Sequence, residues 1–271
     1  TRIIDKPIVC SFSGGETSAY MAIRLKEEYP DTVFTFANTG EENEETLDFA
    51  HQVDQKYGLN LVWVECVVTH EKGIGYKTAA RKGEPFEEVI KKYGLPNPSQ
   101  PHCTRELKRV PLDKWANENV GRDHFKAIGI RIDEIDRIKP NYKENGYIYP
   151  LAFWWPTTKN EINTFWRDQP FRLNLKHYQG NCKVCYKKSF RKLSWIMKET
   201  PEHFDFFRRM EREHGYTNAM QDFDEPIRIY RNHRTIQDIE DMLPMAQEPI
   251  DDAQLYEVNK DLFGYVDEDD Q

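Results

Sequence analysis

The chain has 271 residues, and its 46 acidic residues outnumber its 38 lysines and arginines, which gives a formal net charge of -8. This balance argues against a protein that coats nucleic acid indiscriminately, and no apolar run approaches the roughly 20 residues that span a bilayer. The length allows one large domain, or one domain with a substantial appendage. Residues 1–6 lack the apolar centre of a signal peptide, so we expect a cytoplasmic protein.

The first element is an apolar run over residues 7–12 that stops at Ser13-Gly14-Gly15. Helical spacing of apolar residues resumes at Tyr20 and Met21, which predicts a buried strand, a tight glycine turn and a helix. The first N–H groups of a helix have no helical acceptor, and the helix dipole adds positive charge there, so the turn suits a phosphate.

This turn resembles the SGGxDS loop of the PP-loop ATP pyrophosphatases. Thr17 stands where many members have aspartate, which is similar to the phosphoadenosine phosphosulfate (PAPS) reductase-like branch. The resemblance implies a site for ATP with Mg²⁺, with Ser13 and Thr17 catalytic and with nucleotide contacts from Ser11, Ser13, Gly14, Gly15, Thr17 and Ser18. The alternative is an ordinary glycine turn. A lysine-bearing GxxxxGK[ST] loop is absent, which argues against a kinase-like or GTPase-like site.

The next elements alternate between strand and helix. A helix to about residue 29 is followed by a strand over 32–37, a helix over 44–57 and a strand over 59–64. This order predicts an α/β fold with a parallel sheet, and the resemblance makes it an adenine nucleotide alpha-hydrolase-like domain. Because ligands bind at the carboxyl ends of such strands, we expect Ser13, Asn38 and Cys66 to gather there.

The polar turn after the second strand is Asn38-Thr39-Gly40. With Glu42 and the residues that follow, it resembles the NTGxExxET segment of the PAPS reductase-like proteins. The resemblance implies that Asn38 or Thr39 lies beside the adenine and ribose. The alternative is a helix-capping loop, with acidic residues in the first helical turn.

Residues 67–101 are rich in glycine and proline and predict a lid or substrate loop with a short helix over 86–93. Four cations there could meet an anionic substrate: Lys72, Lys77, Arg81 and Lys82. The alternative is that they are exposed side chains without a specific role.

A helix from residue 102 to about 119 is predicted next, then a strand over 125–131 and a polar turn over 132–137. Gly129-Ile130-Arg131, with the acidic residues that follow, resembles a glycine–arginine–acidic segment of the same reductase-like branch. The resemblance implies nucleotide contacts by Gly129 and Arg131, and we assign catalytic roles to Lys108 and Arg131. Guanidinium groups bind oxyanions through two parallel hydrogen bonds. The alternative for Arg131 is a structural network with Asp133, Glu134 and Asp136.

The rest of the chain is predicted to be helical, over 161–166, 190–198, 202–214 and 235–243. We therefore divide the chain into a nucleotide-binding domain, residues 1–170, and a cysteine-containing helical region, residues 171–271. The stretch 172–198 holds eight lysines and arginines and no acidic residue. It predicts a basic surface for a polyanion, or simply a solvated helix face.

The five cysteines are irregularly spaced, which indicates thiols or metal ligands rather than a disulfide framework. Cys182 and Cys185 form a CxxC, and Cys103 precedes them. This order resembles the assimilatory adenylylsulfate reductases, in which a double cysteine and a later CxxC hold a [4Fe-4S] cluster. His102 replaces one cysteine here, so the implied cluster has three thiolates and one open iron, available to an exogenous atom, His102 or Cys66. Zinc and the absence of a metal are the alternatives.

We therefore expect an enzyme that adenylates its substrate with ATP, releases pyrophosphate and transfers sulfur with a [4Fe-4S] cluster. The expected partners are a nucleotide substrate, a tRNA or DNA acceptor, a sulfur donor that the sequence does not identify, and further copies of the chain. The second reading is a variant sulfonucleotide reductase; those enzymes use a C-terminal cysteine, and none follows Cys185 in this sequence. The third is a nucleotide-binding module without turnover.

Overall fold

The computed structural model describes residues 4–66, 74–180, 182–218 and 221–249. Lys72 and the acidic residues at the C-terminal end lie outside this part. Contacts group the described residues into two compact units. The first is drawn from Thr1–Asn38, Glu44–Ala80 and Leu107–Asn174, and the second from Thr39–Asn43, Arg81–Glu106 and Leu175–Gln271. The domain boundary at residue 170 stays a prediction; the second unit also includes two stretches from the N-terminal half.

The first unit is built on a five-stranded sheet with the order β3-β2-β1-β4-β5. All neighbouring strands in it run parallel. The strands are Ile8–Phe12 (β1), Val33–Asn38 (β2), Val62–Glu65 (β3), Phe125–Ala127 (β4) and Tyr147–Ile148 (β5). The predicted α/β fold with a parallel sheet is confirmed.

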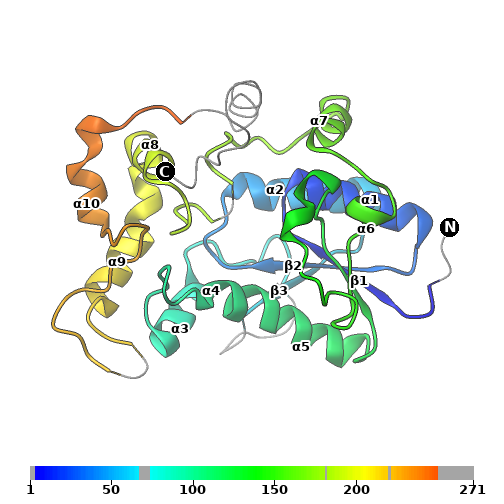
Figure 1. Ribbon diagram of the computed structural model, residues 1–271, viewed down its shortest axis with the longest axis horizontal. Coiled ribbons are helices and arrows are strands. Elements are labelled where there is room, and N and C mark those ends of the chain that lie inside the picture. The colour runs from blue at the N-terminus through cyan, green and yellow to red at the C-terminus, as the bar shows by residue number, and fades with distance from the viewer. Residues whose placement is uncertain (1–3, 67–73, 181, 219–220, 250–271) are drawn as a thin grey trace. The chain divides into compact units, whose positions relative to one another are not determined.

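The inner strands are apolar because helices cover both faces of the sheet (Figure 1). Helices α1 (Glu16–Glu28) and α2 (Glu44–Tyr57) lie on one face, and α5 (Val110–Asn119) contacts β2 and β3 from the other. Cys10 lies in the middle of β1, beside Phe34 and Ala127 of the neighbouring strands. Burial raises the pKa of its thiol, as expected for a small core residue.

Helix α7 (Lys159–Arg167) packs against α1 and completes the core of the first unit. Trp166 of α7 is fully buried, and its ring meets Phe49 of α2 edge-on at 4.9 Å between centroids. Its indole N–H donates to the carbonyl of Glu16, 2.9 Å away. The aromatic residues of this helix are therefore core residues, and they also fix the start of α1.

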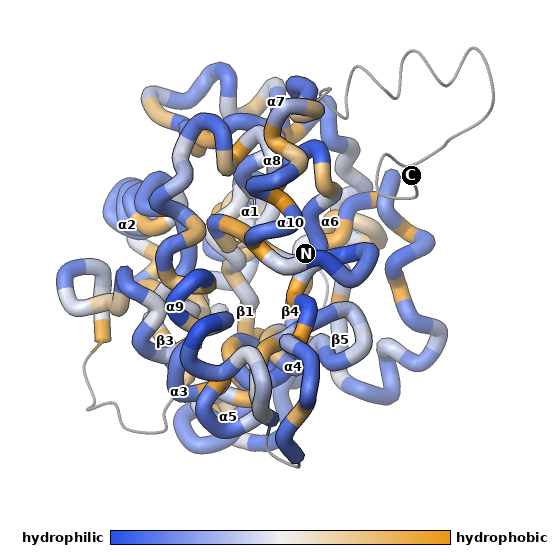
Figure 2. Tube along the Cα trace, turned by 90° about the vertical axis from the view of Figure 1, so that its left-hand side faces the viewer, coloured by the Kyte–Doolittle hydropathy of each residue, from blue (hydrophilic) through white to orange (hydrophobic). Residues whose placement is uncertain are grey.

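The described part of the second unit contains helices joined by long segments without regular secondary structure. Its helices are α3 (Glu84–Tyr93), α4 (His102–Thr104), α8 (Phe190–Glu199), η3 (Pro201–Phe204), α9 (Asp205–His214), α10 (Ile236–Asp241) and η4 (Leu243–Met245). Figure 2 shows α9 as mostly hydrophilic, and the buried residues of this helix are its three apolar ones, Phe206, Phe207 and Met210. Phe86 of α3 packs against two of these residues.

Several predicted elements differ from the structure. The strand predicted over 125–131 ends at Ala127, because the N–H of Ile130 turns back to the carbonyl of Ile128. The helix predicted from 102 to 119 contains a π-helical turn, η1 (Arg105–Arg109), and the polar turn is a 3₁₀ helix, η2 (Ile132–Arg137). β5 and the one-turn helix α6 (Pro150–Phe153) are too short to give a periodic pattern.

No helix in the described ranges is both long and apolar enough to cross a membrane.

Candidate functional site

The predicted phosphate loop follows β1, the strand at which the order of successive strands in the sheet reverses. β1 is followed in sequence by β2 on one side, whereas β4 and β5 extend the sheet on the other side. Ligands of open α/β sheets bind at the carboxyl ends of the two strands that flank this switch point, here β1 and β4. Residues 13–15 follow β1 and residues 128–131 follow β4. The sheet order therefore places Ser13 and Arg131 on the loops where a ligand is expected.

The hydroxyl of Ser18 closes the loop. It accepts a hydrogen bond from the N–H of Ser13 at 3.0 Å and donates one to the carbonyl of Gly15 at 2.9 Å. The Ser13 hydroxyl lies 2.9 Å from the same oxygen and is the donor in that pair, because the single proton of Ser18 is already used. These bonds set the loop at the N-terminus of α1, and Ser13 is exposed at its edge.

Two glycines are required by this packing. Gly14 has φ +81°, and a Cβ on it would lie 2.4 Å from Cγ2 of Thr46. A Cβ on Gly129 would lie 3.3 Å from the Cα of Ser18, so the chain after β4 passes directly beside the loop. Ser11, also predicted to contact the nucleotide, is half-buried within β1 and pairs with Thr35 of β2.

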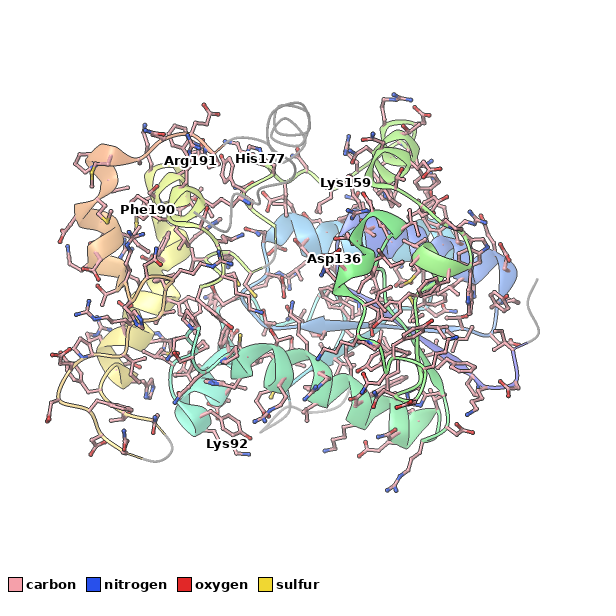
Figure 3. All side chains as sticks on the ribbon, in the orientation of Figure 1. Lys92, Asp136, Lys159, His177, Phe190 and Arg191 are labelled. Atoms are coloured by element: carbon pink, nitrogen blue, oxygen red, sulfur yellow. The ribbon has the colours of Figure 1, made fainter. Side chains whose placement is uncertain are left out.

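Arg131 reaches the loop and is also paired with acidic residues. Its Nη1 donates to Oγ1 of Thr17 at 3.3 Å, which brings two predicted site residues together. Nε donates to Asp133 at 2.9 Å, and Nη1 lies 3.2 Å from Glu134. The structural network with Asp133 and Glu134 is thus present, and the contact of Arg131 with a nucleotide stays a prediction. Asp136, labelled in Figure 3, is exposed on the same 3₁₀ helix.

Asn38 is completely buried at the end of β2. Its amide nitrogen donates to Oε1 of Glu65 at 2.6 Å and to the carbonyl of Ala80 at 2.8 Å. Glu65 in turn accepts from the N–H of Ala80 at 2.7 Å. The side chain thus holds the ends of β2 and β3 together, and its contact with a nucleotide stays a prediction. We did not predict the role of Glu65, although it is the one charged residue of its strand.

Lys108 is half-buried in the π-helical turn η1. Such turns occur frequently at functional sites, but the catalytic role of Lys108 stays a prediction.

In the second unit, the residues after β2 pair with the CxxC segment. Glu42 and Cys182 form an antiparallel bridge, and the N–H of Lys183 donates to the carbonyl of Glu41 at 2.9 Å. The Thr39 hydroxyl donates to Glu42 at 3.2 Å and lies 3.7 Å from the sulfur of Cys182. The predicted contact of Thr39 with a nucleotide stays a prediction.

Cys103, Cys182 and Cys185 all belong to this second unit. Burial raises the pKa of the Cys103 thiol, and the negative charge of Cys185 raises it further. The pKa of the buried Tyr186 is raised by its burial and by both of these cysteines. The sulfur of Cys182 is directed to Thr39 and lies 4.0 Å from Glu42.

The described side chains do not form a site for a single metal ion, because no three His, Cys, Asp or Glu residues among them converge closely enough. Ligands of one tetrahedral zinc would bring sulfurs to within about 4 Å of one another. The metal centre predicted at Cys103, Cys182 and Cys185 is therefore not confirmed. One residue has a feature of a metal ligand: Nε2 of His102 is buried and makes no hydrogen bond within the described residues. Burial also lowers the pKa of His102, which favours the neutral imidazole that metals bind.

The basic stretch 172–198 does not form one solvated face. Lys188 is buried and its ammonium donates to the carbonyls of Tyr178 and Gly180, while burial lowers its pKa to about 8. Lys187 is exposed, and Arg191 at the start of α8 (Figure 3) donates to Gln247 at 2.9 Å. Only part of the stretch is therefore an exposed basic surface. The sequence alone could not show which lysine is buried.

Replacing Gly14 by alanine tests the loop geometry. The Cβ clash with Thr46 and the positive φ should lower the free energy of unfolding by about 1–3 kcal/mol, as measured by urea denaturation. Gly15→Ala is the matched control, because Gly15 has φ -102° and its Cβ would meet nothing closer than Ser13 Oγ at 3.8 Å. Equal stability of the two variants would contradict this geometry.

Glu41 should make stability depend on pH. Burial raises its pKa from 4.5 to about 7, so between these values the folded protein holds a proton that the unfolded chain releases. The free energy of unfolding therefore falls as pH rises from 4.5 through 7. Glu41→Gln should flatten this fall in urea titrations at pH 5–8. Part of the fall should remain in this variant, because the pKa of Glu211 is also raised to about 7. Exposed Glu45→Gln is the control, and an unchanged slope in Glu41→Gln would refute the assignment.

Comparisons with known proteins identify the domain family of this chain. The profile of the phosphoadenosine phosphosulfate reductase domain matches residues 7–134, from β1 into η2. The chain is 34% identical over 205 residues to an uncharacterized nin region protein of Escherichia phage lambda, covering 70% of this chain and 69% of that protein. It is 27% identical to an uncharacterized protein of Methanocaldococcus jannaschii, over 78% of this chain but only 43% of that protein's length.

Among solved structures, PAPS reductase from Candida auris in a phosphate complex aligns with a TM-score of 0.40 and 15% identity, over 62% of this chain and 74% of that chain. The domain profile and the phage relative, which is similar over two thirds of both chains, give the family: this chain belongs to the phosphoadenosine phosphosulfate reductase domain family.

Proposed function

We propose that this protein is an enzyme that binds ATP with Mg²⁺ at residues 13–18 and adenylates an acceptor oxygen. The acceptor oxygen forms a bond to the α-phosphorus, and the bond from that phosphorus to the pyrophosphate oxygen breaks. The observation that carries the proposal is the Ser13–Ser18–Gly15 hydrogen-bond arrangement at the N-terminus of α1, beside the switch point of the sheet.

The residues of this loop have distinct roles in the proposed reaction. The N–H groups of the first turn of α1 bind phosphate oxygens, because they have no acceptor within the helix. The exposed Ser13 hydroxyl turns from Ser18 when the ligand binds and donates its hydrogen bond to the pyrophosphate. Arg131, held against Thr17 by Asp133 and Glu134, stabilises the charge that develops on the α-phosphate.

Cys103, Cys182 and Cys185 would hold a [4Fe-4S] cluster, with the fourth iron left for a sulfur atom or for His102. Their shared unit and the effect of Cys185 on the pKa of Cys103 support this assignment. The irons of a cluster lie apart, so its cysteines need not converge on one point as they do around zinc. Such a cluster, when bound, supplies an iron that can carry the sulfur to be transferred. The acceptor is a nucleotide or a nucleic acid, and exposed Lys187 near Cys185 suits its phosphates.

Sulfonucleotide reduction is the second candidate, because the matching family profile is that of PAPS reductase. In that case the same loop binds the phosphates of the sulfonucleotide. The two functions differ in their products: AMP and pyrophosphate from ATP in the first, and sulfite in the second.

The full chain should release pyrophosphate from MgATP when tRNA or DNA is added. AMP should follow when sulfide is also supplied, because the sulfur bonds to the acceptor atom and the bond from that atom to the AMP oxygen breaks. Arg131→Gln should lower the turnover about 100-fold, by loss of charge stabilisation at the α-phosphate. Ser99→Ala, an exposed serine of the second unit, is the control. Sulfite release from PAPS with thioredoxin would favour the reductase instead, and ATP binding without turnover on any acceptor would favour a binding module.

Anaerobically purified protein should contain iron and acid-labile sulfide, with a broad visible absorption. Replacement of Cys103, Cys182 or Cys185 by serine should remove most of the iron, because each thiolate holds one iron of the cluster. Cys10→Ser is the control, since Cys10 is fully buried within the sheet of the first unit. Stoichiometric zinc, or metal-free protein with intact folding, would disprove the cluster.

A further inference from the structure

Glu16 places a carboxylate directly after the two glycines of the phosphate loop. It is the first residue of α1, where a negative charge interacts favourably with the helix dipole. The same charge lies close to the proposed phosphate site, where it would repel a polyphosphate. The loop therefore needs a cation to offset Glu16 before it can bind a highly charged anion.

Arg172, from the segment after α7, supplies this cation. Its Nε donates to Oε1 of Glu16 at 3.0 Å and its Nη2 to Oε2 at 3.1 Å, so the guanidinium and the carboxylate form two parallel hydrogen bonds. The Glu16 side chain is only 14% exposed, whereas that of Arg172 is 49% exposed. Trp166 of α7 donates to the backbone carbonyl of Glu16, so residues 166–172 hold both the backbone and the side chain of this residue.

We propose that Arg172 is a positioning residue that neutralises Glu16 and thereby sets the charge that the phosphate loop accepts. This inference rests on the proposed nucleotide site at residues 13–18. Arg172 acts through Glu16 and holds its carboxylate away from incoming phosphates. The pair makes the loop suited to di- and triphosphates rather than to ligands of low charge, such as a nucleoside monophosphate.

Charge compensation and a purely structural role predict different changes in phosphate affinity when Glu16 or Arg172 is replaced. If the pair only fixes the fold, removal of either partner disturbs the loop and weakens binding. If it sets the charge, Arg172→Gln exposes the Glu16 carboxylate and weakens binding, whereas Glu16→Gln leaves the guanidinium unpaired beside the loop and strengthens it. The double variant should bind like the unaltered chain, because it has the same net charge at this position.

The test is calorimetric titration of the full chain with inorganic pyrophosphate, ATP and AMP at low ionic strength. Arg172→Gln should weaken pyrophosphate binding about tenfold, with a smaller effect on AMP, because the electrostatic energy grows with the charge of the ligand. Glu16→Gln should strengthen pyrophosphate binding, and the double variant should restore the original affinity. Salt at about 1 M, where the Debye length is about 3 Å, should remove most of these differences.

Two further variants separate charge from geometry. Arg172→Lys keeps the charge but loses the two parallel hydrogen bonds, so its affinity for pyrophosphate should stay near that of the unaltered chain. Arg167→Gln is the control, because Arg167 is exposed and pairs with its neighbour Asp168 rather than with a residue of the loop in the described part of the chain. Weaker binding in both Glu16→Gln and Arg172→Gln, or unchanged binding in both, would overturn this inference alone. An unaltered chain that binds neither ATP nor pyrophosphate would overturn the proposed nucleotide site as well.

Discussion

The candidate site depends on the hydroxyl of Ser18. This oxygen accepts from the N–H of Ser13 and donates to the carbonyl of Gly15, so it fixes the backbone between the strand and the helix. Gly129 passes beside the Cα of the same serine, which brings the chain after β4 against the loop. Ser18 thus contacts both loops at the switch point, one through its hydroxyl and the other through its backbone. The orientation of the first N–H groups of α1 follows from this arrangement.

Most of the first unit could be predicted from the sequence because its signals are local. The apolar run before Ser13, the glycines after it and the alternation of strands with helices each extend over a few residues. The sheet order is a tertiary property, yet the parallel fold restricts it to few arrangements. The predicted strand over 125–131 is longer than β4, because Ile128 and Ile130 continue the apolar pattern past the last strand residue, Ala127. The sequence cannot show that the backbone turns there.

The surroundings of the cysteines could not be predicted, because they come from contacts between distant parts of the chain. The sulfur of Cys182 meets Thr39, 143 positions away, and the backbone of Lys183 bonds to that of Glu41. Thr39 was grouped with the nucleotide residues because its segment resembles that of the PAPS reductase-like proteins. The segment belongs to the unit that holds the CxxC, and its contact with a nucleotide stays a prediction. The burial of Lys188 could not be predicted for the same reason. It depends on backbone carbonyls that accept hydrogen bonds from the ammonium group, and no local sequence pattern encodes them.

Both arginines at the phosphate loop carry acidic partners, and this has a consequence for how the loop binds anions. Arg131 is balanced by Asp133 and Glu134, and Arg172 is balanced by Glu16. A loop with unpaired arginines would attract any anion, and its like charges would destabilise the folded chain before a ligand bound. Pairing removes that cost. In the proposed nucleotide site, the helix N–H groups would then recognise phosphates through directed hydrogen bonds, while the arginine pairs would set how much negative charge the loop accepts.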